Sequence, residues 1–225
     1  MSITFARDAT HLNIKAIPAG MLAALYTTGS RDIKATADDF ATHPNCVRIC
    51  QDHGSDITAD ILDMEIGAAN PLDCVVWITK ARMSFNNVMR PGQRWPGIYA
   101  SLSRITELAN AFVTAKITNV PLWIAEWGLG QGIAINQIES ASGPFPIIGF
   151  QIRNDGASDF DIFSTEWLNN RSKMPSSITP MVPPGQWNDP KVWEWKDATM
   201  IGIGLDGKLH SFKFDPATGQ WTKSE

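Results

Sequence analysis

Short apolar runs recur between residues 3 and 170, separated by helix-length segments or polar loops. The runs are rich in β-branched or aromatic residues and end at Gly, Pro or polar residues, which is typical of buried strands. The predicted strands are residues 3–8, 21–28, 46–50, 59–67, 95–100, 120–127, 145–152 and 160–163. Strands separated in this way usually pair in parallel, so this series predicts an α/β fold, a (β/α) barrel of TIM type, whether regular or irregular.

Helices are predicted where apolar positions recur at helical spacing. One begins at Thr36, which forms a capping-box pattern with Asp39, and a second begins at Pro71. A third covers residues 104–115, with Ser103 as its N-cap. The expected buried side of the second helix contains Leu72, Val75, Val76, Ile78 and Thr79, and that of the third contains Ile105, Leu108, Ala109 and Phe112.

The end of the chain has a different pattern. Prolines recur between residues 173 and 190, which indicates a linker. Beyond it, apolar runs at 192–195, 199–205 and 209–214 are separated by turn signals and predict an antiparallel meander. We therefore expect a barrel over residues 1–172, a linker over 173–190 and a small antiparallel β extension over 191–225.

Composition excludes some function classes. The 225 residues carry a formal net charge of −4, so nothing favours nucleic-acid binding. Cys46, Cys50 and Cys74 form no CxxC pattern, and we expect buried free thiols, no metal site and no cofactor. The Asp52-His53 pair is interpreted as a turn in preference to a metal site or a base. No signal peptide or membrane-spanning run is recognisable, which predicts synthesis in the cytoplasm and no membrane partner.

Two acids one residue apart interrupt the fourth apolar run. Side chains alternate along a strand, so Asp63 and Glu65 should point to the same side, with Cβ atoms roughly 6–7 Å apart. Ionised carboxylates this close repel each other, which raises the pKa of the less solvated one and suits a proton donor near neutral pH. The alternative is a solvated strand end with one acid in a salt bridge.

The carboxyl ends of the other predicted strands add acids and aromatic residues. Catalytic groups of (β/α) barrels lie at these ends. The residues collected there are Asp8, Asp52, Asp63, Glu65, Tyr99, Glu126, Trp127, Gln151 and Asp161. Sugars offer hydroxyls to carboxylates and apolar faces to aromatic rings, so the set suits a glycan. No Gly-rich phosphate loop or Ser-His-Asp order is present.

Some of these residues have alternative roles. Asp8 is either a site residue or a loop cap. Asp161 and Asp159 compete for one role, and we favour Asp161 because Phe160 and Ile162 would flank it as core residues. Glu126 is either a subsite residue or part of an ion pair at the barrel rim.

The successive motifs resemble those of glycoside hydrolase family 25, the lysozyme-like N-acetylmuramidases of bacteria and phage endolysins. The resemblance spans about residues 3–170, with the motifs in order. It rests on Asp8 ending the first strand, Asp63-Met-Glu65, Pro96-Gly-Ile-Tyr99, Leu122-Trp-Ile-Ala125 and the segment from Gln151 to Asp161. The chain departs from the family at Ile152, where an aromatic residue is usual, and at Trp127, where Tyr is usual.

The resemblance implies a role for each matching residue. Glu65 would be the general acid, and Asp63 would assist by orienting and stabilising the N-acetyl group of the substrate. Asp8 and Asp161 would complete the acidic ring, and Tyr99 would line the subsite nearest the cleaved bond. From the strand ends we add Trp127, Glu126 and Gln151 as substrate-binding residues.

Two functions from different classes follow. The first is a peptidoglycan hydrolase that cuts the β-1,4 bond after N-acetylmuramic acid and acts at the bacterial cell wall on glycan strands. The second is a phage virion or tail-associated protein that uses the barrel for glycan binding or as an inactive scaffold, with other virion proteins as partners of the C-terminal extension. A third hypothesis is a glycosidase acting on a different amino-sugar polymer. The Trp-rich extension is interpreted as a meander with an apolar interface, in preference to an independent cell-wall binding module.

Overall fold

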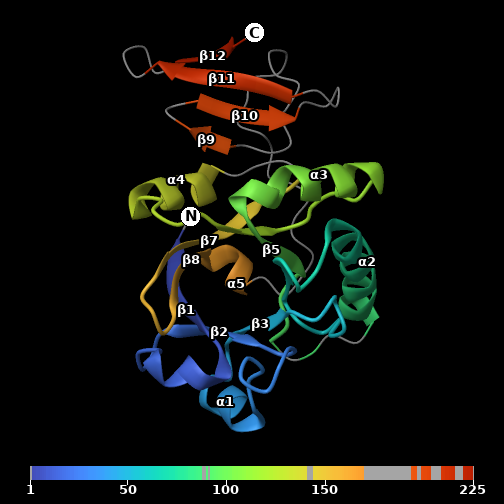
Figure 1. Ribbon diagram of the computed structural model, residues 1–225, viewed down its shortest axis with the longest axis vertical. Helices are drawn as coiled ribbons and strands as arrows, with labels where there is room; N and C mark the ends of the chain where they lie inside the picture. The colour runs from blue at the N-terminus through green and yellow to red at the C-terminus, as the bar shows by residue number, and fades with distance from the viewer. Residues whose placement is uncertain are drawn as a thin grey trace.

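The computed structural model describes residues 2–87, 90, 92–140 and 144–169, together with the backbone of four strands beyond residue 193 (Figure 1). The strands of the first part are β1 (Ile3–Ala9), β2 (Leu22–Tyr26), β3 (Val47–Cys50), β4 (Ile61–Met64), β5 (Gly97–Ser101), β6 (Leu122–Ala125), β7 (Ile147–Asn154) and β8 (Asp159–Ser164). The α-helices are α1 (Ala37–Thr42), α2 (Pro71–Asn87), α3 (Ile105–Thr114), α4 (Gln131–Ser140) and α5 (Thr165–Asn169). Two 3-10 helices are η1 (His11–Ala16) and η2 (Leu102–Arg104).

Strands β1 to β8 form a closed barrel in chain order. Neighbouring strands from β1 to β7 are parallel, whereas β8 runs antiparallel to both β7 and β1. The structure therefore confirms a closed eight-stranded barrel with helices, but its strand directions are mixed, and the expectation of parallel pairing is wrong for β8. Only residues 155–158 join β7 to β8, and a connection this short makes a hairpin, because a parallel crossover needs a dozen or more residues.

The reversal of β8 decides which of its residues reach the site. Strands β1 to β7 end on one side of the barrel, which we call the carboxyl end. Because β8 runs the other way, its first residue, Asp159, lies beside Asp8 near the end of β1. Asp161 pairs with Ala6 and therefore lies two residues further into the barrel.

Of the residues expected on the buried side of α2, only Ile78 is fully buried. Cys74, Trp77, Ile78, Ala81 and Phe85 are buried, and they share one face at i, i+3, i+4, i+7 and i+11. Leu72 and Val76, expected to be buried, are exposed. The sequence is apolar on more than one side here, so spacing alone could not identify the side that meets the barrel.

Two expected helix starts have different outcomes. Thr36 and Asp39 form the capping box before α1 through reciprocal hydrogen bonds, as predicted. Ser103 does not cap α3, because the chain first makes η2 and α3 begins after Arg104 without a side-chain cap. The four apolar residues expected on the buried side of α3 are all buried.

Side chains fill the amino end of the barrel, and α5 covers it. Trp123 and Phe163 have ring centroids 4.9 Å apart inside the barrel, and Phe163 stacks on Trp167 of α5 at 5.7 Å. The indole N–H of Trp167 donates to the carbonyl of Trp95, which precedes β5, at 3.0 Å. In Figure 1, α5 lies over the middle of the ring of strands. The amino end of the barrel is therefore closed, and a candidate site is to be sought at the carboxyl end.

The strands beyond residue 193 are β9 (Glu194–Lys196), β10 (Thr199–Ile203), β11 (Leu209–Asp215) and β12 (Gln220–Ser224). They form an antiparallel sheet in the order β12-β11-β10-β9, which confirms the predicted meander. The predicted linker at 173–190 lies outside the described residues. The three cysteines are buried and free, as expected.

Candidate active site

Asp63 and Glu65 lie at the carboxyl end of β4 and differ in burial. Asp63 is fully buried, and within the described part of the chain neither of its carboxyl oxygens accepts a hydrogen bond of good geometry. Burial, followed by the charge of Glu65, raises the pKa of Asp63 to about 8, although the Glu65 backbone and the Gln51 side chain favour the ionised form. Glu65 itself is exposed. The pair therefore combines a buried acid, protonated near neutral pH, with an acid that a ligand can reach.

Tyr99 connects this pair to the opposite wall. It is opposite Asp63 in the β4–β5 register, and its hydroxyl oxygen lies 3.2 Å from Oε1 of Glu65. The same hydroxyl lies 2.8 Å from Oε1 of Gln151 on β7. Burial, helped by the surrounding carboxylates, raises the pKa of Tyr99, so the phenol keeps its proton. Tyr99 is therefore a hydrogen-bond donor beside Glu65.

Gln151 has the most side-chain hydrogen bonds in the site. Its Oε1 accepts from the Tyr99 hydroxyl and, at 3.0 Å, from the indole N–H of Trp127. Its Nε2 donates to Oδ2 of Asp8 at 2.9 Å and to Oδ2 of Asp159 at 3.3 Å. The amide thus joins β1, β5, β8 and the segment after β6.

Asp8, Asp159 and Asp161 form an acidic group between β1 and β8. Burial, and next the neighbouring Asp159, raises the pKa of Asp8 well above its usual range. Burial also raises the pKa of Asp161, and the charges of Asp8 and Asp159 add to this. Among the described residues, neither carboxyl oxygen of Asp161 accepts a hydrogen bond of good geometry, although the backbone of Asp8 favours its ionised form. Asp161, the acid that the sequence favours, is the deeper one and pairs with Ala6 and Gln151, whereas Asp159 pairs with Asp8 and accepts a hydrogen bond from the Gln151 side chain.

Trp127 and Glu126 follow β6 at the rim of the barrel. Trp127 is 68% exposed although its indole N–H is hydrogen-bonded, so its ring is open to solvent. The backbone N–H of Glu126 donates to the carbonyl of Gln151 at 2.9 Å. Both residues therefore lie at the carboxyl end, as predicted from the strand ends.

The sequence did not single out three further residues near these acids. Tyr26 ends β2, and the charges of Asp8 and Asp63 help burial to raise its pKa. Gln51 follows β3 and interacts with Asp63. Arg104 donates to the carbonyl of Met64 at 3.0 Å, and its charge lowers the pKa of Asp63. Their positions at strand ends were a signal for Tyr26 and Gln51, but Arg104 reaches the site from η2 and had no such signal.

The other features considered in the sequence lie outside this group of acids or form no binding site. Asp52 and His53 fall in a turn, as expected, and His53 Nδ1 lies 3.1 Å from Oδ2 of Asp73. The described residues include no group of three or more His, Cys, Asp or Glu side chains arranged to hold a metal ion. Within the same residues, no helix has the length and apolar character needed to cross a membrane.

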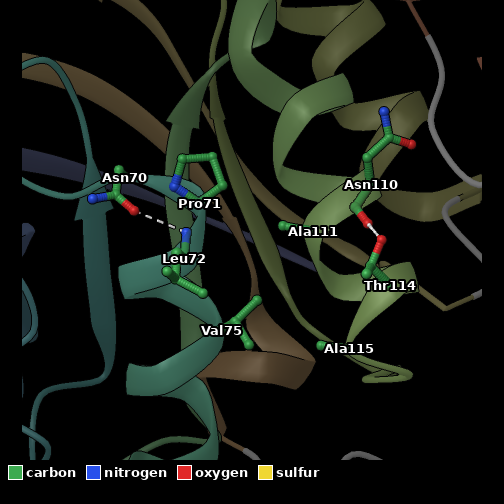
Figure 2. Close-up of a pocket in the computed structure, with 8 residues that line it drawn as sticks. All are labelled: Asn70, Pro71, Leu72, Val75, Asn110, Ala111, Thr114 and Ala115. Carbon is green, nitrogen blue, oxygen red and sulfur yellow. Dashed lines mark hydrogen bonds between the residues drawn. The ribbon is translucent and has the colours of Figure 1, made fainter.

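A groove of about 550 Å³ lies between α2 and α3, away from the acids (Figure 2). It is lined by Asn70, Pro71, Leu72, Val75, Asn110, Ala111, Thr114 and Ala115. Figure 2 shows Leu72 and Val75 on α2 facing the small side chains of α3. None of the lining residues is an acid or a base, so the groove has no group for proton transfer.

No protein-family model and no curated protein matches the chain. Among solved structures, the chain is similar to the crystal structure of an uncharacterized B. stearothermophilus protein. The two share 10% sequence identity at a TM-score of 0.47, over 73% of this chain and 98% of that chain. This similarity carries no information about function.

Proposed function

We propose that this protein is a glycoside hydrolase that cleaves the β-1,4 bond after N-acetylmuramic acid in peptidoglycan, with Glu65 as general acid and Asp63 assisting. The observation that carries the proposal is the pairing of exposed Glu65 with buried Asp63, whose oxygens have no well-aligned partner in the described structure. Buried acceptors normally have partners, so an unsatisfied one at a strand end suggests that a ligand supplies the donor. The N–H of a 2-acetamido group is such a donor.

The raised pKa values favour participation of the substrate's own acetamido group. A carboxylate must be ionised to act as a nucleophile. The pKa of Asp63 is about 8, so near neutral pH this acid is mostly protonated, and burial also raises the pKa values of Asp8 and Asp161. The acetamido carbonyl oxygen then replaces a carboxylate as the attacking group.

The proposed reaction has two steps. In the first, Glu65 gives its proton to the glycosidic oxygen, the bond from that oxygen to the anomeric carbon breaks with both electrons leaving on oxygen, and the acetamido oxygen bonds to the carbon. In the second, water attacks the same carbon, passes a proton to Glu65 and releases the acetamido oxygen. The carbonyl oxygen of protonated Asp63 accepts the acetamido N–H throughout, and this dipole orients the group and stabilises the partial positive charge on its N–H.

The other site residues have supporting roles in this proposal. Tyr99 contacts Glu65 and lies where it would line the subsite of the cleaved bond. The exposed ring of Trp127 would stack on a sugar face at the rim. The partner is the glycan strand of peptidoglycan, and the place of action is the bacterial cell wall.

The test is digestion of purified peptidoglycan by the wild-type chain and by Glu65→Gln. Borohydride reduction of the digest identifies the new reducing end, because a muramidase leaves muramitol and a glucosaminidase leaves glucosaminitol. We expect muramitol from the wild type and at least a hundredfold less from Glu65→Gln, the scale of effect of general acid catalysis. The matched control is Glu166→Gln, which removes an exposed acid on α5 and should leave activity unchanged.

Three results would contradict or change the proposal. Glucosaminitol would point to a different amino-sugar bond. Binding to the cell wall without cleavage would support the glycan-binding scaffold. Equal inertness of wild type and Glu65→Gln on cell walls of several chemotypes would reject hydrolysis.

A further inference from the structure

The side-chain amide of Gln151 has no hydrogen-bonding capacity left for a substrate. A primary amide has two acceptor positions on oxygen and two donor hydrogens on nitrogen. Here the oxygen accepts from Tyr99 and Trp127, and the nitrogen donates to Asp8 and Asp159. Gln151 is also buried. The side chain expected from sequence to bind substrate is therefore fully engaged with the protein.

Trp127 fixes the orientation of the Gln151 side-chain amide. An indole N–H can only donate, so the atom 3.0 Å from Trp127 Nε1 must be the amide oxygen. Without the indole, the flipped amide could also be satisfied at its inner end, because burial favours the protonated form of Asp8, which can donate to the amide oxygen. Trp127 therefore selects between two orientations of Gln151 that the acids alone would both accept.

The orientation of Gln151 decides where the Tyr99 proton goes. A phenol has one hydrogen, and two oxygens lie within reach, Gln151 Oε1 at 2.8 Å and Glu65 Oε1 at 3.2 Å. With the amide oxygen facing it, Tyr99 donates to the nearer atom, and its own oxygen is left to accept from a protonated Glu65. With the amide flipped, Nε2 would donate to Tyr99, and the Tyr99 proton would turn to an ionised Glu65. The observed orientation therefore leaves the Tyr99 oxygen available as a hydrogen-bond acceptor on the side of Glu65.

We propose that Gln151 is a positioning residue through which the indole N–H of Trp127 sets the direction of the Tyr99 hydroxyl beside Glu65. Trp127 then has two separable features, a ring that faces solvent and an N–H that acts through Gln151 and Tyr99. The catalytic consequence rests on the proposed glycosidase function, but the hydrogen-bond relay does not.

The relay can be tested without turnover, because the chain contains only two tyrosines, Tyr26 and Tyr99. Tyrosine labelled with carbon-13 at Cζ gives two NMR resonances, and Tyr99→Phe identifies the one from Tyr99. Trp127→Phe keeps an aromatic ring and removes the N–H. We expect this variant to shift the Tyr99 resonance, because the hydroxyl changes its hydrogen-bond partner.

The control is Trp77→Phe, which removes an indole N–H that donates to the carbonyl of Asp56, at 2.9 Å. It should leave the Tyr99 resonance in place. Gln151→Met should shift the resonance, and adding Trp127→Phe to it should change nothing more, because interactions that share one intermediary are not additive. An unchanged Tyr99 resonance in Trp127→Phe would overturn the relay, and additive shifts in the double variant would overturn its route through Gln151.

Kinetics on peptidoglycan fragments then test the catalytic consequence. Loss of one neutral hydrogen bond corresponds to a fall of about three- to tenfold, and we expect this fall in kcat with KM nearly unchanged. A rise in KM with unchanged kcat would mean that Trp127 acts only as a stacking surface. If the wild type has no activity, the proposed function fails, whereas the NMR result still decides the relay.

Discussion

Asp63 is completely buried and Glu65, two residues later, is exposed, although both project from the carboxyl end of β4. The strand ends at Met64, so Asp63 still belongs to the barrel wall and Glu65 has left it. One backbone segment therefore gives two acids opposite environments. This contrast separates the proposed roles, because the buried acid holds its proton and the exposed acid can meet a substrate.

We predict that Asp63→Asn reduces the loss of stability that accompanies a rise in pH from about 4 to about 8. The pKa of Asp63 is about 8 in the folded chain and near 3.8 in an unfolded one, so the native state binds one more proton between these values. The free energy of unfolding should therefore fall as pH rises from about 4 to about 8, by a few kcal/mol for this group. Asn has no proton to lose, and its variant should show a smaller fall.

Urea midpoints between pH 5 and pH 8.5 measure this effect. Asp32→Asn, at an exposed position, is the control and should follow the wild-type curve. Some dependence should remain in Asp63→Asn, because the pKa values of Asp8 and Asp161 are also raised. Parallel curves for wild type and Asp63→Asn would show that Asp63 is ionised across this range.

Trp127→Ala should weaken glycan binding. The ring is exposed beside the acids, and aromatic contacts of this kind contribute about 0.5–1.5 kcal/mol, which corresponds to roughly three- to tenfold in affinity. Calorimetry with a chitotetraose probe measures the dissociation constant. Ile133→Ala, which removes another exposed apolar side chain on α4, is the control. Equal affinities of wild type and Trp127→Ala would place the sugar elsewhere.

Arg94→Met should destabilise the barrel strongly. Arg94 Nη1 lies 3.1 Å from the buried carboxylate of Asp60 and also donates to the carbonyl of Cys46 at 2.9 Å. Removing one partner of a buried ion pair leaves a charge without compensation and costs about 3–5 kcal/mol. The urea midpoint should fall accordingly, whereas Arg31→Met at an exposed position should stay within about 0.5 kcal/mol. A small effect of Arg94→Met would mean that Arg90, 3.1 Å from Asp60, compensates alone.

Two glycine substitutions should change the free energy of unfolding in opposite directions. A Cβ on Gly97 would lie 2.7 Å from the backbone oxygen of Pro121, so Gly97→Ala must displace β5 from its neighbour and should cost about 1–3 kcal/mol. A Cβ on Gly132 in α4 meets nothing within 4 Å, so Gly132→Ala should add up to about 1 kcal/mol through helix propensity. Thermal midpoints of both variants, compared with wild type, test the packing of the barrel and of α4 separately.

The hydrophobic pattern located the strands and placed Asp63 and Glu65 at the end of one of them. It did so because the buried positions of a strand or helix recur at a fixed spacing and are occupied by apolar residues. This spacing can be recognised from neighbouring positions in the sequence. Asp8, Tyr99, Trp127 and Gln151 could be collected for the same reason, as each ends or follows a predicted strand. The direction of β8 could also have been read from the chain, since the connection after β7 is too short for a crossover.

Only the tertiary structure decided which of these groups interact. Arg104 contacts Met64, which lies 40 positions away in the sequence, and Gln151 contacts Asp8, which lies 143 positions away. The spacing of apolar residues gives no information about contacts over such separations. Burial and neighbouring charges likewise depend on the closed barrel, and they, not the residue type, raise the pKa of Asp63. The sequence by itself therefore determined the strands and the acids, and the closure of the barrel determined which of these acids are buried and have a raised pKa.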